Sequence, residues 1–138
     1  MTLEGKVALV TGAGQGVGQG IALALASAGA TVAVTGRTLS KLESTCEEIA
    51  KRGGESLPLV CDVKDGESLS ATVDTMVEQF GGLNILVNNA QEVPLGTLHQ
   101  VEDDAFTRGW ESGPLATFRL MKPVSYTHLT LPTNRVAG

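Results

Sequence analysis

Apolar runs and amphipathic stretches alternate along the chain from Lys6 to Val87. The runs Lys6–Val10 and Thr31–Thr35 are rich in β-branched residues and lack the apolar–polar alternation of a half-exposed strand, so they predict buried strands. Leu57–Cys61 and Leu83–Val87 predict two further short strands. Four strands separated by longer segments indicate a sheet whose strands are joined by crossovers.

The segments between these strands repeat apolar residues at helical spacing, which predicts three helices. Their predicted apolar positions are Val17, Ile21, Ala24, Leu25 and Ala28 in the first helix, Leu39, Leu42, Cys46 and Ile49 in the second, and Leu69, Val73, Met76, Val77 and Phe80 in the third. Asp65 is expected to cap the third helix, and Gly29, Gly53 and Gly81 stand where the three helices should end. Cys46 is expected to be buried and inert.

Strand and helix alternate strictly, which predicts an α/β fold with a doubly wound parallel sheet and right-handed crossovers. The expected order of the four strands is 3-2-1-4, with phosphates at the carboxyl end of the first strand. A further helix is expected over Glu102–Lys122, although Gly109, Gly113 and Pro114 disfavour a regular helix there.

Composition and charge exclude several classes of function. The 138 residues, 42% hydrophobic and 18% charged, suffice for one folded domain with a sizeable core. A net charge of −5 without a basic block argues against nucleic acid or an anionic membrane as a partner. No apolar run approaches a membrane span and Met1–Lys6 does not open a signal peptide, so we expect a cytoplasmic protein. Neither Cys46 nor Cys61 belongs to a cluster with metal-ligand spacing, so no metal is expected.

The segment Thr11–Gly18 is a glycine-rich loop, T-G-x-x-x-G-x-G, between the first strand and the first helix. Gly12 lets the chain turn sharply, while Gly16 and Gly18 remove side chains where backbone approaches a pyrophosphate or packs on a strand. The following helix N-terminus offers unpaired N–H groups and a partial positive charge. A tight structural turn is the alternative, but the strand–loop–helix context favours a nucleotide site.

Two later motifs extend this pattern: Asp62-Val63 follows the third strand and Asn88-Asn89-Ala90 follows the fourth. With the glycine-rich loop, they resemble the short-chain dehydrogenase/reductase family over Met1 to about Pro123. The resemblance implies a Rossmann-type NAD(P)-binding domain over residues 1–123, truncated relative to the family. The cofactor-binding residues that it implies are Gly12, Gly14, Gln15, Gly16, Val17, Gly18, Arg37, Asp62, Val63, Asn89 and Ala90.

The end of the second strand bears on the choice of cofactor. An acidic residue there would accept hydrogen bonds from the ribose of NAD and repel a 2′-phosphate. This chain has Gly36 and then Arg37, whose guanidinium can hold a phosphate through a fork of N–H donors. NADP(H) is therefore favoured over NAD(H), although Gln15 offers no second positive charge. A solvated arginine is the alternative.

The chain also departs from the family pattern. Gln91 stands where the family has the glycine of N-N-A-G, and an ungapped alignment puts Gly113 where the family carries a catalytic Asn. The family's catalytic Ser and Tyr-x-x-x-Lys are not found, because Tyr126, the one tyrosine, is followed four residues later by Thr130. No catalytic residue is assigned, and the chain by itself is expected to be inactive.

The last residues do not continue the pattern of the preceding elements. Val124–Thr133 resembles a translated reading frame of a sequencing-library transposon adaptor. We therefore expect residues 124–138 to be a non-native or disordered tail, and the natural protein to continue differently after about Pro123. A genuine but divergent C-terminus is the alternative.

The resemblance implies an oxidoreductase that, at full length, transfers a hydride between NADP(H) and a small carbonyl or alcohol substrate. It also implies a homo-oligomeric full-length protein. A non-catalytic NAD(P)-binding module or redox sensor is the alternative, favoured by Gln91 and Gly113. A methyltransferase would share the glycine-rich loop but leave the two later motifs unexplained. The sequence does not specify the substrate or the direction of the reaction.

Overall fold

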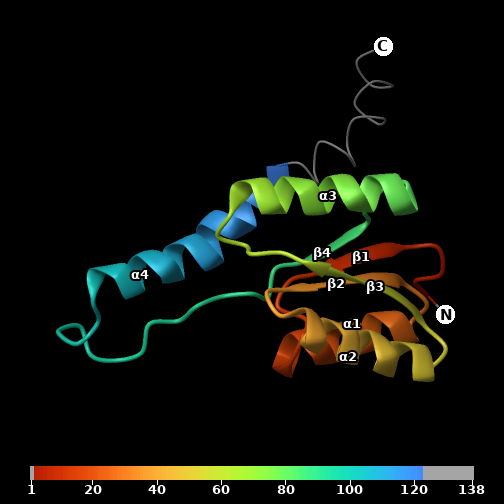
Figure 1. Cartoon of the computed structure of the whole chain (residues 1–138), viewed down its shortest axis with the longest axis horizontal. Helices are drawn as coiled ribbons and strands as arrows, with labels where there is room; N and C mark the ends of the chain where they lie inside the picture. The colour runs from red at the N-terminus through yellow and green to blue at the C-terminus, as the bar shows by residue number, and fades with distance from the viewer. Residues whose placement is uncertain (1, 123–138) are drawn as a thin grey trace, which may run out of the picture.

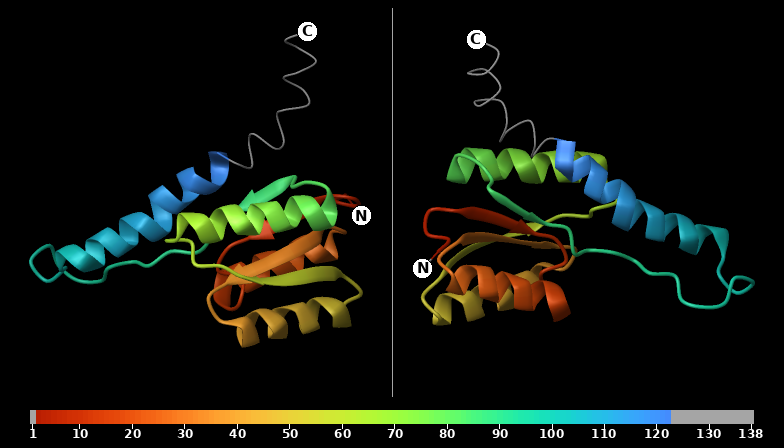
Figure 2. Two further views of the ribbon diagram at one scale, coloured as in Figure 1. Left: turned by 45° about the horizontal axis from the view of Figure 1, so that its top comes forward. Right: turned by 180° about the vertical axis from the view of Figure 1, so that it is seen from behind.

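A four-stranded parallel sheet forms the centre of the structure, with helices on both of its faces (Figures 1 and 2). The computed structural model describes residues 2–122. The strands are β1 (Val7–Val10), β2 (Thr31–Gly36), β3 (Glu55–Val60) and β4 (Ile85–Val87). Their order is β3-β2-β1-β4 and every pairing is parallel, so the predicted doubly wound sheet with order 3-2-1-4 is confirmed.

The helices lie on the two faces of this sheet as the crossovers require. They are α1 (Gly16–Ser27), α2 (Leu39–Lys51), α3 (Gly66–Phe80) and α4 (Asp103–Trp110). Helices α1 and α2 cover one face, and α3 covers the other (Figure 1). The Asp65 carboxylate accepts hydrogen bonds from the N–H groups of Glu67 and Ser68, which confirms the predicted cap of α3.

Strand β1 is buried on both faces and divides the core into two clusters. Val7 and Leu9 pack on the α3 side, whereas Ala8 and Val10 pack on the side of α1 and α2. Strand β4 begins at Ile85, later than the sequence predicts, and just before it the Asn84 side chain accepts the Val7 N–H at 2.9 Å. The parallel strands end together at their carboxyl edge, where the candidate site lies.

The apolar stripe predicted for α1 is only partly correct. The buried residues of this helix are Gly18, Ala22 and Ala26, whereas Val17 is 73% exposed. Small residues bring the helix axis close to the sheet, so the larger side chains Ile21 and Leu25 pack only at its flanks. The small face of α1 therefore keeps the glycine-rich loop against the end of β1.

Helix α2 differs from the sequence analysis at its apolar face. Leu42 and Ile49 are buried as expected, but Leu39 is exposed and Cys46 is only half-buried. Burial nevertheless raises the pKa of the Cys46 thiol, which favours its protonated and less reactive form.

The helix expected over Glu102–Lys122 contains a π-helical segment. After α4 the chain forms η1 (Glu111–Leu115) and then continues as α-helix over residues 116–122. Pro114 lies within η1, where the wider turn accommodates a residue that has no N–H group. Helix α4 extends away from the sheet (Figure 2), whereas Ala116 and Leu120 pack in the α3 cluster. The tail expected at 124–138 lies outside the described residues.

Candidate nucleotide site

A cleft of about 360 Å³ lies at the carboxyl edge of the sheet, where the ends of all four strands contribute to its wall. The predicted cofactor-binding residues that line it are Gly12, Gly14, Gln15, Gly16, Arg37, Asp62, Val63, Asn89 and Ala90. Two others do not line it, since Gly18 lies buried beside Gly12 and the Val17 side chain is exposed. The structure thus brings most of the predicted set together, and its role in binding stays a prediction.

The glycines of the loop are required for different reasons. A Cβ on Gly18 would overlap the Gly12 carbonyl oxygen and lie 2.5 Å from Asn89 Nδ2, so this position has no room for a side chain. Gly16 has φ +59°, which favours glycine, and the space in front of it is open. Because α1 begins at Gly16, its first N–H groups lack partners within the helix. Open space beside unpaired N–H groups fits a pyrophosphate.

Thr11 joins the glycine-rich loop to the Asn-Asn-Ala motif. Its Oγ1 accepts the Asn89 N–H at 2.9 Å and the Ala90 N–H at 3.0 Å. Asn89 in turn donates through Nδ2 to the Gly12 carbonyl at 3.2 Å. This role of Thr11 was not predicted, although the position of the residue directly after β1 and beside the first glycine was the available signal.

A second threonine holds the other side of the loop. Thr45 of α2 is fully buried and donates to the Ala13 carbonyl at 3.0 Å, while the Ala13 N–H donates to the Thr35 carbonyl at 2.9 Å. The helical pattern of α2 predicts that residue 45 faces inward, but nothing in the sequence says that it contacts the loop. These bonds hold the glycine-rich loop to β2 on one side and to α2 on the other.

Lys41 supplies a positive charge that the sequence analysis missed. Its Nζ donates to Gln15 Oε1 at 2.8 Å, and both residues line the cleft together with Arg37. A Cβ on Gly14 would lie 2.9 Å from Lys41 Cβ, so the absence of a side chain at Gly14 allows α2 to approach the loop. Two cations therefore border the cleft near the end of β2.

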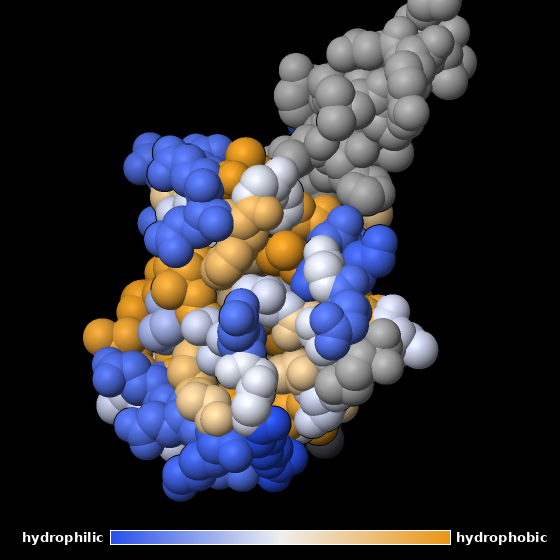
Figure 3. Space-filling model, turned by 90° about the vertical axis from the view of Figure 1, so that its right-hand side faces the viewer, coloured by the Kyte–Doolittle hydropathy of each residue, from blue (hydrophilic) through white to orange (hydrophobic). Residues whose placement is uncertain are grey.

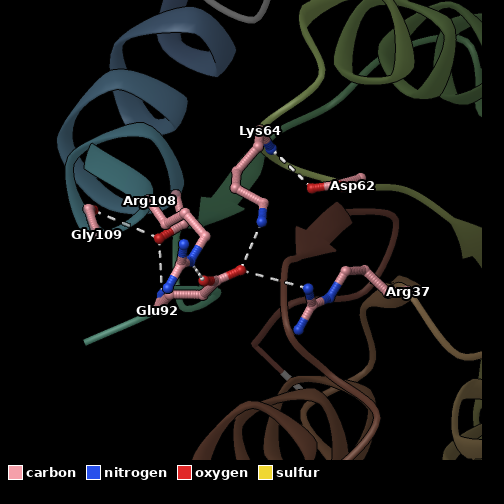
Figure 4. Close-up of polar contacts among 7 residues, drawn as sticks. Arg37, Asp62, Lys64, Glu92, Arg108 and Gly109 are labelled. Atoms are coloured by element: carbon pink, nitrogen blue, oxygen red, sulfur yellow. Dashed lines mark hydrogen bonds and ion pairs between the residues drawn. The ribbon is translucent and has the colours of Figure 1, made fainter. Parts of the chain in front are cut away.

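The Glu92 carboxylate, which also lines the cleft, forms ion pairs with three cations (Figure 4). Its Oε1 lies 2.6 Å from Lys64 Nζ and 3.4 Å from Arg37 Nη1, and its Oε2 lies 3.2 Å from Arg108 Nε. The Lys64 hydrogen bond and the charges of the neighbouring cations hold the pKa of the Glu92 carboxyl below its ordinary value. Asp62 also lines the cleft, and its Oδ1 accepts the Lys64 N–H at 3.0 Å.

The two departures from the family pattern, Gln91 and Gly113, are in contact. A Cβ on Gly113 would lie 2.9 Å from Gln91 Nε2 and 3.1 Å from Gln91 Cδ. A side chain at position 113 would therefore have to displace the Gln91 carboxamide. The Gln91 side chain therefore occupies space that a side chain at position 113 would need.

The described residues, 2–122, lack the features of two other classes of site. No group of three or more His, Cys, Asp and Glu side chains there is arranged to hold a metal ion. In the same residues, no helix has the length and apolar character needed to cross a membrane.

The comparisons with known proteins agree with this geometry. Residues 6–130 match the family model described as short chain dehydrogenase. An uncharacterized oxidoreductase of Thermotoga maritima is 39% identical over 123 residues, which cover 88% of this chain and 48% of that protein. Versicolorin reductase of Emericella nidulans is 37% identical over 128 residues, covering 92% of this chain and 48% of the relative.

Solved structures show the same likeness. A metagenomic short-chain oxidoreductase in complex with NADP matches with a TM-score of 0.89 at 30% identity, covering 95% of this chain and 60% of that one. NAD+-bound xylitol dehydrogenase matches with a TM-score of 0.89 at 32% identity, covering 95% of this chain and 51% of that one. Of the two curated relatives above, the chain spans about half the length, 48% in each case.

Proposed function

The chain belongs to the short-chain dehydrogenase family, and we propose that the complete protein transfers a hydride between NADP(H) and a small carbonyl or alcohol substrate. In this proposal the complete protein consists of residues 1–123 and a natural continuation in place of residues 124–138. The nicotinamide supplies or accepts the hydride when it is bound. The described residues bind and orient the cofactor.

The observation that carries the preference for NADP(H) is the charge at the end of β2. Gly36 has no side chain to place a carboxylate there, and Arg37 and Lys41 both line the cleft. A phosphate ester on the ribose would gain charge-assisted hydrogen bonds from these side chains. A relative solved with NADP and another solved with NAD+ are about equally similar to this chain, so the proposal rests on this chain's own residues.

Other parts of the cleft would take the rest of the cofactor. The open space in front of Gly16 fits the pyrophosphate, and Asp62 and Val63 border the position expected for adenine. Asn89 and Ala90, held by Thr11, line the part of the wall where the proposal puts the nicotinamide.

Replacing Arg37 by alanine in the complete protein is expected to make the binding free energy of NADPH less favourable by about 1.5–3 kcal/mol. This is the range for a hydrogen bond to a charged group. NADH binding should change little, because it carries no 2′-phosphate. Calorimetric titration of both cofactors measures the difference. Arg52→Ala is the matched control, since Arg52 lies at the end of α2, pairs with Glu48 and does not line the cleft. Equal losses for both cofactors at Arg37 would contradict the proposal.

We also propose that residues 1–123 form an incomplete domain and that residues 124–138 are foreign to it. The adaptor-like segment Val124–Thr133 supports this, although the family match runs on to residue 130. The complete protein would be cytoplasmic and homo-oligomeric. Sequencing the gene downstream of Lys122 tests the boundary, and an unchanged sequence would refute it.

The 138-residue chain itself is expected not to catalyse hydride transfer at an enzymatic rate. It contains no Tyr-x-x-x-Lys, and general acid–base help contributes typically about 10²–10⁴-fold to such rates. The measurement is NADPH oxidation by the purified chain with a panel of aldehydes and ketones. Substantial turnover with any of them would refute this expectation.

A non-catalytic NAD(P)-binding module is the second candidate, favoured by the contact between Gln91 and Gly113. Gln91 lines the cleft, and Gly113 lies behind its side chain, so the two departures from the family pattern meet beside the cleft wall. The complete gene discriminates between the candidates: a catalytic Ser and Tyr-x-x-x-Lys support the enzyme, and their absence supports the module.

A further inference from the structure

The cations around Glu92 come from three separate parts of the fold (Figure 4). Arg37 follows β2, Lys64 follows β3, and Arg108 lies on α4. They meet one carboxylate, whose two oxygens are both engaged. Because Arg37 also borders the position proposed for the 2′-phosphate, the cleft contains an internal anion that shares a cation with the cofactor.

The three ion pairs are unequal. Lys64 makes the shortest contact, 2.6 Å, and its side chain is 21% exposed. Arg37 makes the longest, 3.4 Å, and its side chain is 65% exposed, so solvent and salt screen this pair most. Arg37 can therefore exchange Glu92 for another anion while Lys64 and Arg108 keep the carboxylate in place.

The backbone also holds Glu92 where it is. Its N–H donates to Ser112 Oγ at 2.7 Å. A Cβ on Gly109 would lie 3.1 Å from the Glu92 carbonyl oxygen, so the chain packs tightly against α4 at this point. The exchange at Arg37 thus requires only the arginine side chain to move, not the segment that carries Glu92.

We propose that Glu92 is a specificity-determining residue that competes with the 2′-phosphate of NADP(H) for Arg37. This inference rests on the proposed role of Arg37. The 2′-phosphate is an anion at neutral pH, so it must draw the guanidinium away from a carboxylate that is already present. NAD(H) has no such group, and Glu92 does not affect its binding through Arg37. Glu92 therefore lowers the affinity for NADP(H) but not that for NAD(H), and so reduces the preference for NADP(H) that Arg37 creates.

The test measures adenosine 2′,5′-bisphosphate and 5′-AMP binding to the complete protein by calorimetry. Glu92→Gln should bind the bisphosphate about three- to tenfold more tightly, as expected when one charge-assisted contact is freed from competition. Binding of 5′-AMP should not change. Glu78→Gln is the control, since it removes the same charge from an exposed position on α3 that does not line the cleft.

Two further variants keep the test decisive. In an Arg37→Ala background, Glu92→Gln should give no gain. Glu92→Asp, which shortens the reach of the carboxylate, should give a smaller gain and covers the case in which Glu92→Gln fails to fold. Equal gains for both ligands, a gain without Arg37, or no gain in either folded Glu92 variant would overturn the inference. The proposed role of Arg37 in the preference for NADP(H) is contradicted separately, if Arg37→Ala alone leaves the affinity for the bisphosphate unchanged.

Discussion

Replacing Gly18 by alanine is expected to abolish nucleotide binding and to destabilise the protein by at least about 1–3 kcal/mol, the usual cost of overpacking a tight site. The added Cβ would overlap the Gly12 carbonyl oxygen, lie 2.5 Å from Asn89 Nδ2 and lie 2.8 Å from Gly12 C. Two of these three atoms are backbone, which cannot move aside as a flexible side chain does. The loop would have to separate from α1 or from the Asn-Asn-Ala motif, and either movement removes the cleft.

The measurements are chemical denaturation and calorimetric titration with NADPH, made on the complete protein. Gly20→Ala is a matched control on the same helix, because a Cβ at Gly20 meets nothing within 4 Å. Alanine is the better helix former by roughly 1 kcal/mol, so this control should be neutral or stabilising. If Gly18→Ala were as stable as Gly20→Ala and bound NADPH normally, the packing argument would be wrong.

The sequence predicts some features of the fold and not others, and the place of Gly18 in the buried face of α1 belongs to those that it does not predict. The alternation of apolar runs and amphipathic stretches was sufficient for the sheet order, because parallel strands joined by helices leave few topologies. The Asp65 cap was predictable from local chemistry. The buried face of α1 was not predictable in the same way, because Gly18, Ala22 and Ala26 are small and the larger apolar side chain of Val17 indicated a different face.

The same distinction holds for the candidate site. Glycines and the Asn-Asn-Ala motif stand at strand ends, so their gathering at one edge of the sheet follows from topology. Lys41 reaches the cleft because α2 packs closely over Gly14. Glu92 reaches the cleft because the segment after β4 packs on α4 at Gly109. Both contacts depend on tertiary packing, which periodicity does not encode, so the sequence analysis missed both charges.

Apolar surface is exposed on the described part of the chain, in two forms. Strand β4 lies at an edge of the sheet and pairs with β1 alone among residues 2–122. Its residues Ile85–Val87 include no charge and no proline, the usual protection of an edge. Hydrophobic residues are also exposed across one face of the molecule (Figure 3). On α4 and the segment before it, Leu95, Leu98, Phe106 and Trp110 are exposed as well.

We therefore expect the 138-residue chain to self-associate and to bind a hydrophobic dye strongly, because an unpaired edge and exposed apolar patches both promote association. It should elute from size-exclusion chromatography ahead of a 14.3 kDa monomer and melt without a sharp transition. Leu95→Ser combined with Leu98→Ser is the comparison variant, since both side chains are 88% exposed and their loss should reduce dye binding without touching the sheet. The packing of Ala116 and Leu120 against α3 covers part of one face but leaves β4 open at its side. A monomer with a cooperative melt and no dye binding would mean that these four strands and their helices suffice as an independent domain.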